Sequence, residues 1–389
     1  MNNLPPGRGL QTQLVHAGEP EPRIEGAVTM PIFQSATFES AGGGNYHDLR
    51  YGRLSNTPNH HALHRKLATV AGAEAALVTA SGMAAISTAL LTVLHQGDHL
   101  LVQAGLYGGT HDFVVHDLPS FGIRFDFIDA DRPETWAPLL RPETKAIYVE
   151  TLSNPLLSMP DLEAVVRFAR EHRLAALIDN TFPSPVNFRP CPFGFDLALH
   201  SATKYLNGHS DLVAGAVIGR QELVNRVLLR LNHLGGSLDA HACFLLHRGL
   251  KTLALRVEFQ NRSTLEIARF LAAHPRVVRV NYPGLPDHPQ HERARRLLHG
   301  FGGMLSFELE GGATAATRLL ERVQLPVVAP SLGGVETLIT RPAATSHAGL
   351  SAEERQRLGI GEGLVRLSVG IEDTADLIAD LGQALDGER

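Results

Sequence analysis

The chain has 389 residues, of which 44% are hydrophobic and 19% charged, and a formal net charge of -5. This length and composition are typical of a globular protein with a large core and two or three domains. The negative net charge and the lack of a long Lys and Arg run argue against nucleic-acid binding, so we expect small molecules or further copies of the chain as partners.

The two cysteines, Cys191 and Cys243, cannot form a disulfide framework and lack metal-ligand spacing, which favours a reducing, cytoplasmic setting. Met1–Gln11 lacks the apolar core of a signal peptide. The uncharged run Ala75–Leu94 has the length of a membrane span, but Ser81-Gly82 in its middle is typical of a strand-to-helix junction. We therefore expect no membrane segment.

Residues 1–60 are rich in Pro and Gly and show little periodicity, which predicts an extended arm with loops. Such an arm needs a support, for which a neighbouring subunit is a natural though not a unique choice. After a helix at 59–70, strands and helices alternate. We predict strands at 75–79, 99–103, 123–128, 145–150, 174–179 and 196–200, and helices at 82–94, 111–118 and 162–172. This alternation is typical of a mostly parallel sheet covered by helices on both faces, which a strand at 212–218, parallel or antiparallel, closes.

Helical periodicity dominates residues 222–273, and a mixture of short elements follows it. We predict strands at 277–282, 303–309, near 327 and at 365–369, and helices at 288–298, 313–323 and 373–385. The pattern indicates a smaller α+β domain. We thus predict an α/β chain with an arm (1–60), a sheet domain (61–250) and a C-terminal domain (251–389).

Lys204 directly follows a predicted buried strand, in the run His200-Ser201-Ala202-Thr203-Lys204. An ammonium in that position either reaches water or loses its proton and becomes a nucleophilic amine. Asp179 ends another strand, and parallel strands end at the same edge of a sheet. A lysine and an aspartate there match pyridoxal phosphate, which needs an imine partner and an anion at its ring nitrogen. Ser201 and Thr203 can bond its phosphate. The alternatives are a surface lysine and a turn aspartate.

Other polar groups are expected at the same edge. Ser81-Gly82-Met83 begins a helix, whose free N–H groups can bind a phosphate, although any capped helix begins similarly. Tyr107 can stack on a flat ring or simply pack half-buried. Asn154 precedes a proline, and either holds a carboxylate or cofactor oxygen or forms an Asx-turn. Arg366 lies within a strand and suits a bidentate carboxylate, unless it faces solvent at a sheet edge.

Seven ordered motifs between Gln13 and Leu385, together with Tyr51-Gly52-Arg53, carry a family resemblance. They are Ser81-Gly82-Met83-Ala84-Ala85, Leu106-Tyr107-Gly108-Gly109-Thr110, Asn154-Pro155-Leu156, Asp179-Asn180-Thr181-Phe182, Ser201-Ala202-Thr203-Lys204-Tyr205, Ser331-Leu332-Gly333-Gly334-Val335-Glu336 and Arg366-Leu367-Ser368-Val369-Gly370. The chain resembles the transsulfuration (Cys/Met metabolism) family of enzymes that use pyridoxal phosphate (PLP). This family includes cystathionine γ-synthase, cystathionine γ-lyase, cystathionine β-lyase, methionine γ-lyase and the O-acylhomoserine sulfhydrylases.

The resemblance implies a fold type I enzyme, with 61–250 as the PLP-binding domain and 251–389 as the substrate domain. It implies that Lys204 forms the imine and moves protons, with Tyr107 as a further acid or base. The residues that it implies for cofactor binding are Ser81, Gly82, Met83, Tyr107, Asp179, Ser201, Thr203 and Lys204, with Tyr51 and Arg53 from a neighbouring subunit, and those for the substrate carboxylate are Arg366, Asn154 and Ser331. A shared site implies at least a dimer, and in this family usually a tetramer.

The sequence departs from the family pattern in places. Asn56-Thr57-Pro58 replaces the usual Asn-Pro-Thr. Arg50 and Pro330 stand where animal-type cystathionine γ-lyases have glutamates, which removes the natural counter-ions of a distal ammonium. Gly109 stands where methionine γ-lyases typically have cysteine.

The expected activity is β- or γ-elimination from sulfur amino acids, in the manner of cystathionine γ-lyase, to a 2-oxo acid, ammonia and a thiol. The alternatives are γ-replacement on an O-acylhomoserine, a methionine γ-lyase or cystathionine β-lyase activity, and a non-catalytic assembly protein of the same fold. The presence of Lys204, Asp179 and Arg366 argues against a non-catalytic assembly protein. His60, His61 and His64 have a spacing that suits a metal on a helix, but with 20 histidines in the chain we expect no metal site.

Overall fold

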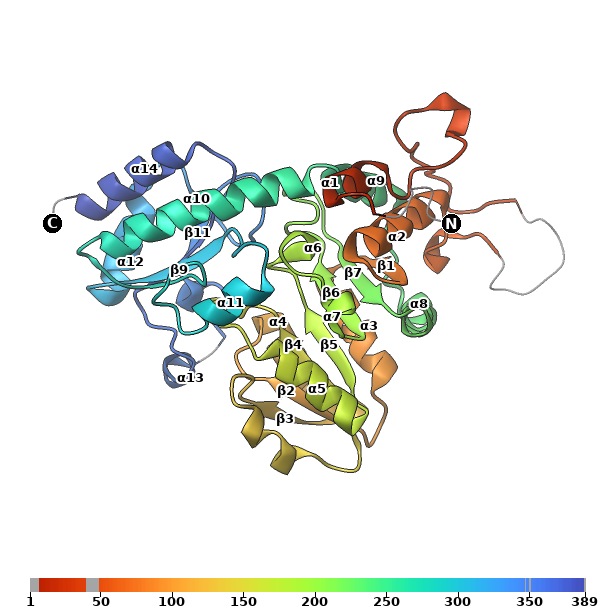
Figure 1. Ribbon diagram of the computed structural model, residues 1–389, viewed down its shortest axis with the longest axis horizontal. Helices are drawn as coiled ribbons and strands as arrows, with labels where there is room; N and C mark the ends of the chain where they lie inside the picture. The colour runs from red at the N-terminus through yellow and green to blue at the C-terminus, as the bar shows by residue number, and fades with distance from the viewer. Residues whose placement is uncertain (1–6, 40–48, 347, 350, 388–389) are drawn as a thin grey trace.

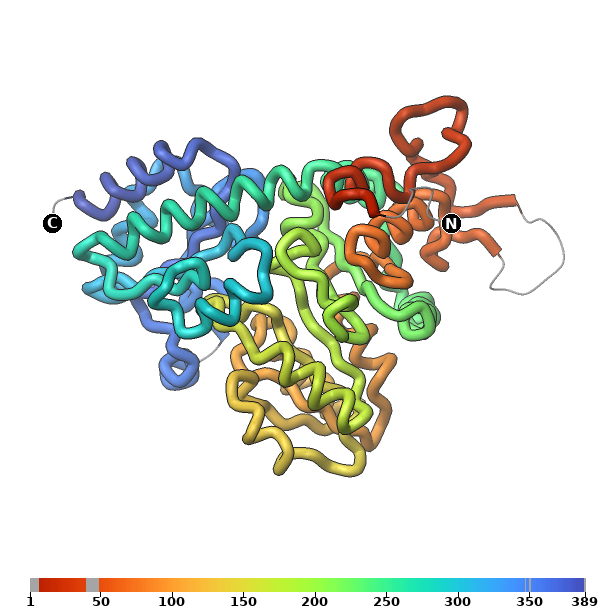
Figure 2. The backbone as a smooth tube through the Cα atoms, in the orientation of Figure 1, coloured from red at the N-terminus to blue at the C-terminus, as the bar shows by residue number. Residues whose placement is uncertain are grey.

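The computed structural model describes residues 7–39, 49–346, 348–349 and 351–387, so two pieces of the predicted arm, 1–6 and 40–48, lie outside the described residues. Two sheets organise the chain (Figure 1). A seven-stranded sheet belongs to the first two thirds of the sequence, and a five-stranded sheet to the last third. The long helix α10 (Leu253–Ala273) runs from the first region along the second, as the tube in Figure 2 shows.

The seven-stranded sheet has the order β1-β7-β6-β5-β4-β2-β3. Its strands are β1 (Ala75–Thr79), β2 (His99–Gln103), β3 (Arg124–Ile128), β4 (Thr144–Glu150), β5 (Ala175–Asp179), β6 (Leu197–Ser201) and β7 (Gly215–Gly219). All neighbouring pairs are parallel except those that include β7, which is antiparallel to both β1 and β6. The predicted α/β class with a mostly parallel sheet is confirmed. Strand β7 completes the sheet between two strands, not at its edge.

Helices bury both faces of this sheet. On one face Val78 and Ile147 join a core with Leu63 and Leu67 of α2 (Pro58–Ala71). Other helices on this face are α5 (Leu162–His172) and α9 (Ala240–Leu250). On the other face the core includes α3 (Gly82–Val93) and α8 (Gln221–Leu234). Double-sided burial explains why these strands read as almost continuous apolar runs.

The five-stranded sheet has the order β10-β11-β12-β9-β8. Its strands are β8 (Val277–Asn281), β9 (Met304–Leu309), β10 (Val327–Val328), β11 (Leu338–Thr340) and β12 (Leu364–Ser368). Helices α10, α12 (Gly312–Arg322) and α14 (Thr374–Asp386) share its core. Strand β11 and helix α13 (Ala352–Arg357) were not predicted: β11 has only three residues, and α13 has no apolar periodicity, although Ser351 and Glu354 form a capping box.

The N-terminal prediction was partly wrong, because Leu10–His16 forms helix α1 instead of extended chain. Leu14 of α1 is fully buried in the core of its own chain. The Lys66 Nζ on α2 donates to the Leu14 carbonyl at 2.7 Å, so a hydrogen bond also anchors the segment. This part of the arm therefore lies on its own subunit.

The predicted helical stretch 222–273 is three helices, α8, α9 and α10, and Gly235 ends the first with a φ of 79°. We propose the predicted boundary near residue 250 as the junction of the two larger domains, because α9 ends there. The uncharged run 75–94 is strand β1 plus helix α3, and no helix in the described part of the chain is long and apolar enough to cross a membrane. The shorter helices are α4 (Gly108–Asp112), α6 (Ser184–Asn187), α7 (Pro190–Phe193) and α11 (His291–Leu297).

Candidate active site

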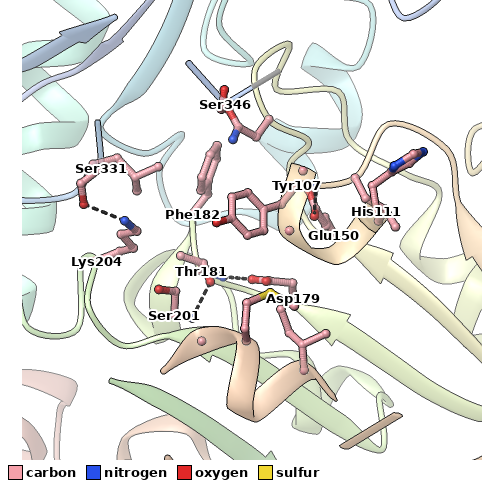
Figure 3. A pocket seen from close by; sticks show the side chains of 18 of the residues that line it. Tyr107, His111, Glu150, Asp179, Thr181, Phe182, Ser201, Lys204, Ser331 and Ser346 are labelled. Carbon is pink, nitrogen blue, oxygen red and sulfur yellow. Dashed lines mark hydrogen bonds between the residues drawn. The ribbon is translucent and has the colours of Figure 1, made fainter. Parts of the chain in front are cut away.

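A cavity of about 880 Å³ lies where the carboxyl ends of β4, β5 and β6 face the C-terminal region. Figure 3 shows side chains from both regions pointing into it. Eleven of the predicted site residues line this cavity: Ser81, Gly82, Met83, Tyr107, Asn154, Asp179, Ser201, Thr203, Lys204, Ser331 and Arg366. Residues far apart in the sequence thus meet at the sheet edge that the strand pattern predicted.

Lys204 lies three residues beyond the end of β6, and its Nζ donates to the Ser331 Oγ at 2.6 Å (Figure 3). Burial, followed by the positive charge of Arg366, lowers the pKa of Lys204 to about 8. An amine with such a pKa is partly unprotonated near neutral pH. The site therefore holds a nucleophile that can attack an aldehyde carbon.

Asp179 ends β5, and its Oδ1 accepts a hydrogen bond from the Thr181 N–H at 2.8 Å. The Thr181 Oγ1 in turn accepts from the Ser201 N–H at 2.8 Å, which ties the ends of β5 and β6 together. Burial raises the pKa of Asp179 to about 6. No Lys, Arg or His of the described ranges forms an ion pair with this carboxylate, so it is available to a cationic group of a ligand.

The start of α3 faces the same cavity. Ser81 caps this helix, its Oγ accepting from the Ala84 N–H at 3.0 Å. A Cβ at Gly82 would lie 2.9 Å from the Ser201 Cβ, so only glycine lets helix and strand end approach this closely. The N–H groups of a helix start favour an anion. Thr203 is less free than predicted, because its hydroxyl donates to the Ala214 carbonyl at 3.1 Å and accepts from the Ala214 N–H at 3.0 Å.

Tyr107 precedes α4, and its side chain is 43% exposed in the cavity. Its backbone N–H donates to the Glu150 Oε1 at 2.7 Å. Burial, followed by the nearby Asp179, raises the pKa of Glu150 well above its usual range. Glu150 thereby fixes the backbone of Tyr107 while its ring stays open to a ligand.

Arg366 on β12 connects the two regions. Its Nη1 donates to the Asn154 Oδ1 at 3.1 Å and its Nη2 to the Ser331 carbonyl at 3.0 Å. Only 5% of Arg366 is exposed, and burial lowers its pKa to about 10. Ser331 has a φ of 87°, a conformation that favours glycine and that costs about 1–3 kcal/mol in other residues. This strained residue presents both its hydroxyl to Lys204 and its carbonyl to Arg366.

Two predicted residues, Tyr51 and Arg53, do not line the cavity of their own chain. The Arg53 Nη1 donates to the Asn232 carbonyl at 2.9 Å, and its guanidinium lies 5.9 Å from the ring centroid of Tyr51. Their predicted contribution to a neighbouring subunit therefore stays a prediction.

The three histidines whose spacing suits a metal, His60, His61 and His64, lie on α2. His60 bonds to Thr57 Oγ1 at 2.7 Å and to the Leu238 carbonyl at 2.8 Å, and the His64 Nε2 accepts from the Val78 N–H at 3.1 Å. These bonds to neighbouring groups account for the burial of His60 and the orientation of His64, whereas His61 is exposed. Within the described ranges, no group of three or more His, Cys, Asp or Glu is placed so that it could hold a metal.

Several lining residues were given no role by the sequence. Glu150 and Thr181 could have been found, since Glu150 pairs with Asp179 in register and Thr181 lies two residues after that aspartate. His111, Phe182 and Ser346 also line the cavity (Figure 3). Ser346 lies in a loop after β11, and nothing in the sequence indicates where such a loop folds back.

The residues present fit PLP. A nucleophilic lysine, a buried carboxylate without a cation among the described residues, and a helix start face one cavity. These are the partners that the aldehyde, ring nitrogen and phosphate of PLP require. A buried arginine across the cavity suits the carboxylate of an amino acid.

Comparisons with known proteins agree with this assignment. Residues 11–386 match the model of a family described as Cys/Met metabolism PLP-dependent enzyme. A cystathionine beta-lyase from Bacillus subtilis is 44% identical over 97% of this chain and 96% of its own, and an L-methionine gamma-lyase from Fusobacterium nucleatum is 40% identical over 97% and 98%. The crystal structure of a cystathionine gamma-lyase from Lactobacillus plantarum, complexed with L-serine, is 37% identical, covers 97% of this chain and 98% of its own, and gives a TM-score of 0.92. The chain therefore belongs to the Cys/Met metabolism family of PLP-dependent enzymes.

Proposed function

We propose that the chain cleaves a C–S bond of a sulfur amino acid by elimination, releasing a 2-oxo acid, ammonia and a thiol. The observation that carries this proposal is that Lys204, Asp179 and Arg366 line one cavity. The lyase names of the relatives support the reaction class.

When bound, PLP supplies an aldehyde for the substrate amino group and a ring that takes up the electron pair of Cα. In the proposed arrangement the Asp179 carboxylate would pair with the ring nitrogen and so favour its protonated form. Gly82 and Met83 at the start of α3, with the Ser201 hydroxyl, would hold the phosphate, and the Thr203 hydroxyl would join them by exchanging its bond to the Ala214 carbonyl for one to the phosphate. Tyr107, whose backbone Glu150 fixes, would stack on the ring.

Arg366 is proposed to bind the substrate α-carboxylate. Its guanidinium nitrogens already point at the oxygens of Asn154 and Ser331, so the side chain is held in place before a ligand arrives. A carboxylate with two oxygens matches this planar donor group. The substrate Cα is thereby kept close to Lys204.

Lys204 is proposed to take the α-proton from the substrate and return a proton later in the reaction. Its pKa of about 8 suits an amine that must act both as a base and as an acid. The Ser331 hydroxyl, 2.6 Å from Nζ, orients the amine toward the cavity. Tyr107 is proposed as a further acid or base because its phenol shares that cavity.

The relatives split between β-lyases and γ-lyases. We favour a thioether of the cystathionine or methionine type as substrate. A panel of L-cystathionine, L-methionine and an O-acylhomoserine with cysteine decides the matter with purified, PLP-loaded protein. 2-Oxobutanoate and ammonia indicate γ-elimination, and pyruvate with homocysteine indicates β-elimination. Cystathionine formed from the O-acylhomoserine, with no keto acid from either thioether, contradicts the proposal and favours γ-replacement.

We also propose a cytoplasmic homo-oligomer in which Tyr51 and Arg53 complete the cavity of a neighbouring subunit. Both residues lie outside the cavity of their own chain, which supports this arrangement. Inactive Tyr51→Ala and Lys204→Ala variants, mixed after mild dissociation, should regain part of the activity, because some mixed sites then carry both native residues. A monomer by light scattering, or no recovery from an oligomer that exchanges subunits, contradicts the shared site.

A further inference from the structure

A second cavity, of about 520 Å³, lies at the opposite edge of the seven-stranded sheet. Lys145 near the start of β4 and Ala175 and Ala176 at the start of β5 line it, whereas the other ends of these strands carry Glu150 and Asp179 in the candidate active site. The two cavities therefore lie at opposite ends of the same strands.

Positive charge gathers around this cavity, although the chain as a whole is negative. Five of its lining residues are cationic and one is acidic: Lys145, Arg170, Arg173, Arg220 and Arg226 against Asp196. The cationic side chains come from β4, from the end of α5 and from the start of α8, so several separate elements contribute to the same cluster.

Asp196, the single carboxylate in the lining, already has partners for both of its oxygens. The Asp196 Oδ1 lies 2.9 Å from the Arg220 Nη2, and its Oδ2 accepts from the Ala176 N–H at 2.8 Å. The Arg226 Nη2 donates to the Thr92 carbonyl at 3.1 Å, which leaves its charge without an anion. Within the described ranges, Lys145, Arg170 and Arg173 also have no carboxylate at ion-pair distance. Four positive charges thus remain uncompensated at one cavity.

The negative end of α5 explains only part of this cluster. Arg170 lies in the last turn of α5 and Arg173 directly after it, where cations are favourable. A helix end carries roughly half an elementary charge, which is much less than the charge gathered here.

The cavity has an apolar floor and a wall kept open by glycine. Ala169, Leu174 and Ala176 are buried beneath the exposed cations. A Cβ at Gly194 would lie 2.7 Å from the Val166 Cγ1 and 3.7 Å from the Arg170 Nη2, and its φ of 127° is one that other residues rarely adopt. Glycine therefore leaves space beside the Arg170 guanidinium.

We propose that this cavity binds a small ligand with two or more phosphate groups. Guanidinium groups bind phosphate oxygens through paired hydrogen bonds, and several of them around one cavity favour several phosphates over one. The cavity volume is in the range of small-molecule sites, roughly 300–1,000 Å³. The site is independent of the proposed lyase activity.

The test is calorimetric titration of the PLP-loaded protein with inorganic tripolyphosphate, with orthophosphate and citrate in parallel. Saturation with PLP fills the phosphate site of the active cavity. We expect one tripolyphosphate per chain, binding at least about tenfold tighter than orthophosphate or citrate, and weakening as salt rises because the cations are exposed. A triple variant, Lys145→Ser with Arg170→Ser and Arg173→Asn, should bind at least about tenfold more weakly.

The matched control removes three exposed cations elsewhere, Arg230→Ser, Arg269→Ser and Arg318→Ser, and should change the affinity less than about twofold. Thermal melting checks that both variants fold. Equal weakening in both variants would show that only net charge matters and would overturn the proposal. So would the lack of saturable binding to the folded wild-type protein, or tighter binding of citrate than of tripolyphosphate.

Discussion

Lys66 on α2 and Lys204 after β6 both belong to the region of the seven-stranded sheet, and burial lowers the pKa of both, to about 7 for Lys66 and about 8 for Lys204. The Lys66 Nζ donates to the carbonyls of Leu14 at 2.7 Å and Val15 at 3.3 Å, and lies 4.0 Å from the Glu19 carboxylate. Lys204 donates to one hydroxyl and faces a cavity of about 880 Å³.

A lowered pKa therefore does not by itself mark a catalytic amine. Three oxygens surround the Lys66 Nζ, and this lysine joins α1 to α2, which is a structural role. Lys204 lacks such a full set of acceptors but has space for a ligand. Access and unsatisfied donors separate the two lysines more clearly than the pKa does.

Among the substitutions that separate the roles of Lys66 and Lys204, Lys204→Ala should have the largest effect. We expect kcat for release of the 2-oxo acid to fall at least about a thousandfold, because no other lysine among the described residues lines the cavity. Borohydride reduction of the PLP-loaded wild type should attach the cofactor to the peptide that contains Lys204. Trapping at another lysine, or unimpaired turnover by the alanine variant, contradicts the assignment.

Lys66→Met should lower the stability of the fold and leave the reactivity of Lys204 intact. Two backbone carbonyls lose their donor in a buried place, so we expect the free energy of unfolding to fall by roughly 2–4 kcal/mol while borohydride labelling of Lys204 persists. Urea unfolding measures the loss. Lys145→Met, at an exposed lysine, is the control and should change stability by less than about 0.5 kcal/mol. Unchanged stability with lost labelling would show that Lys66, too, serves the site.

Arg366→Met tests both substrate binding and the influence of the Arg366 charge on the pKa of Lys204. Loss of the bidentate donor should lower kcat/KM about 10- to 100-fold, mainly through KM. Loss of its positive charge should also raise the pKa of Lys204, which the charge of Arg366 helps to lower. Arg366→Lys retains the charge and should show the KM defect with a smaller change in the pH profile. A pure kcat effect at unchanged KM contradicts a role in substrate binding.

Much of the Lys204 region was predictable from strand ends alone. Once the alternation of elements indicates a parallel sheet, Asp179 and Ser201 must end neighbouring strands at one edge. The motif of Arg366 also predicts a carboxylate site, which stays a prediction, but not the contacts that Arg366 makes. Asn154 lies in the loop after β4, whereas Arg366, 212 residues away, lies on β12 of the other sheet, so only the packing of the two regions brings them together.

The Lys66 region was the less predictable one. Leu10–His16 has seven residues, too few for a clear apolar period, and Lys66 reads as an ordinary polar position on an amphipathic helix. Its burial follows from the tertiary contact with α1. A local pattern cannot show which polar residue a distant segment will cover.

The pH dependence of labelling compares both lysines in one experiment. In cofactor-free protein, the rate of reaction of Lys204 with PLP should rise about tenfold per pH unit below its pKa of about 8 and level off above it, because only the unprotonated amine attacks. Mixing experiments followed by absorbance, with borohydride trapping and peptide mapping, measure this. Lys66 should stay unlabelled despite its lower pKa. Faster labelling of Lys66 would show that access does not distinguish the two amines.

The smallest effect concerns the selectivity of the cavity that Lys204 faces. Arg50 and Pro330 offer no anion to a distal substrate ammonium, but Asp112 also lines the cavity. Its side chain is 72% exposed, so its attraction for a cation is weak. Asp112→Asn should therefore raise KM for L-cystathionine about two- to fivefold and leave KM for L-methionine unchanged, since methionine has no second ammonium. Equal changes for both substrates would mean that Asp112 shapes the cavity without recognising the distal group.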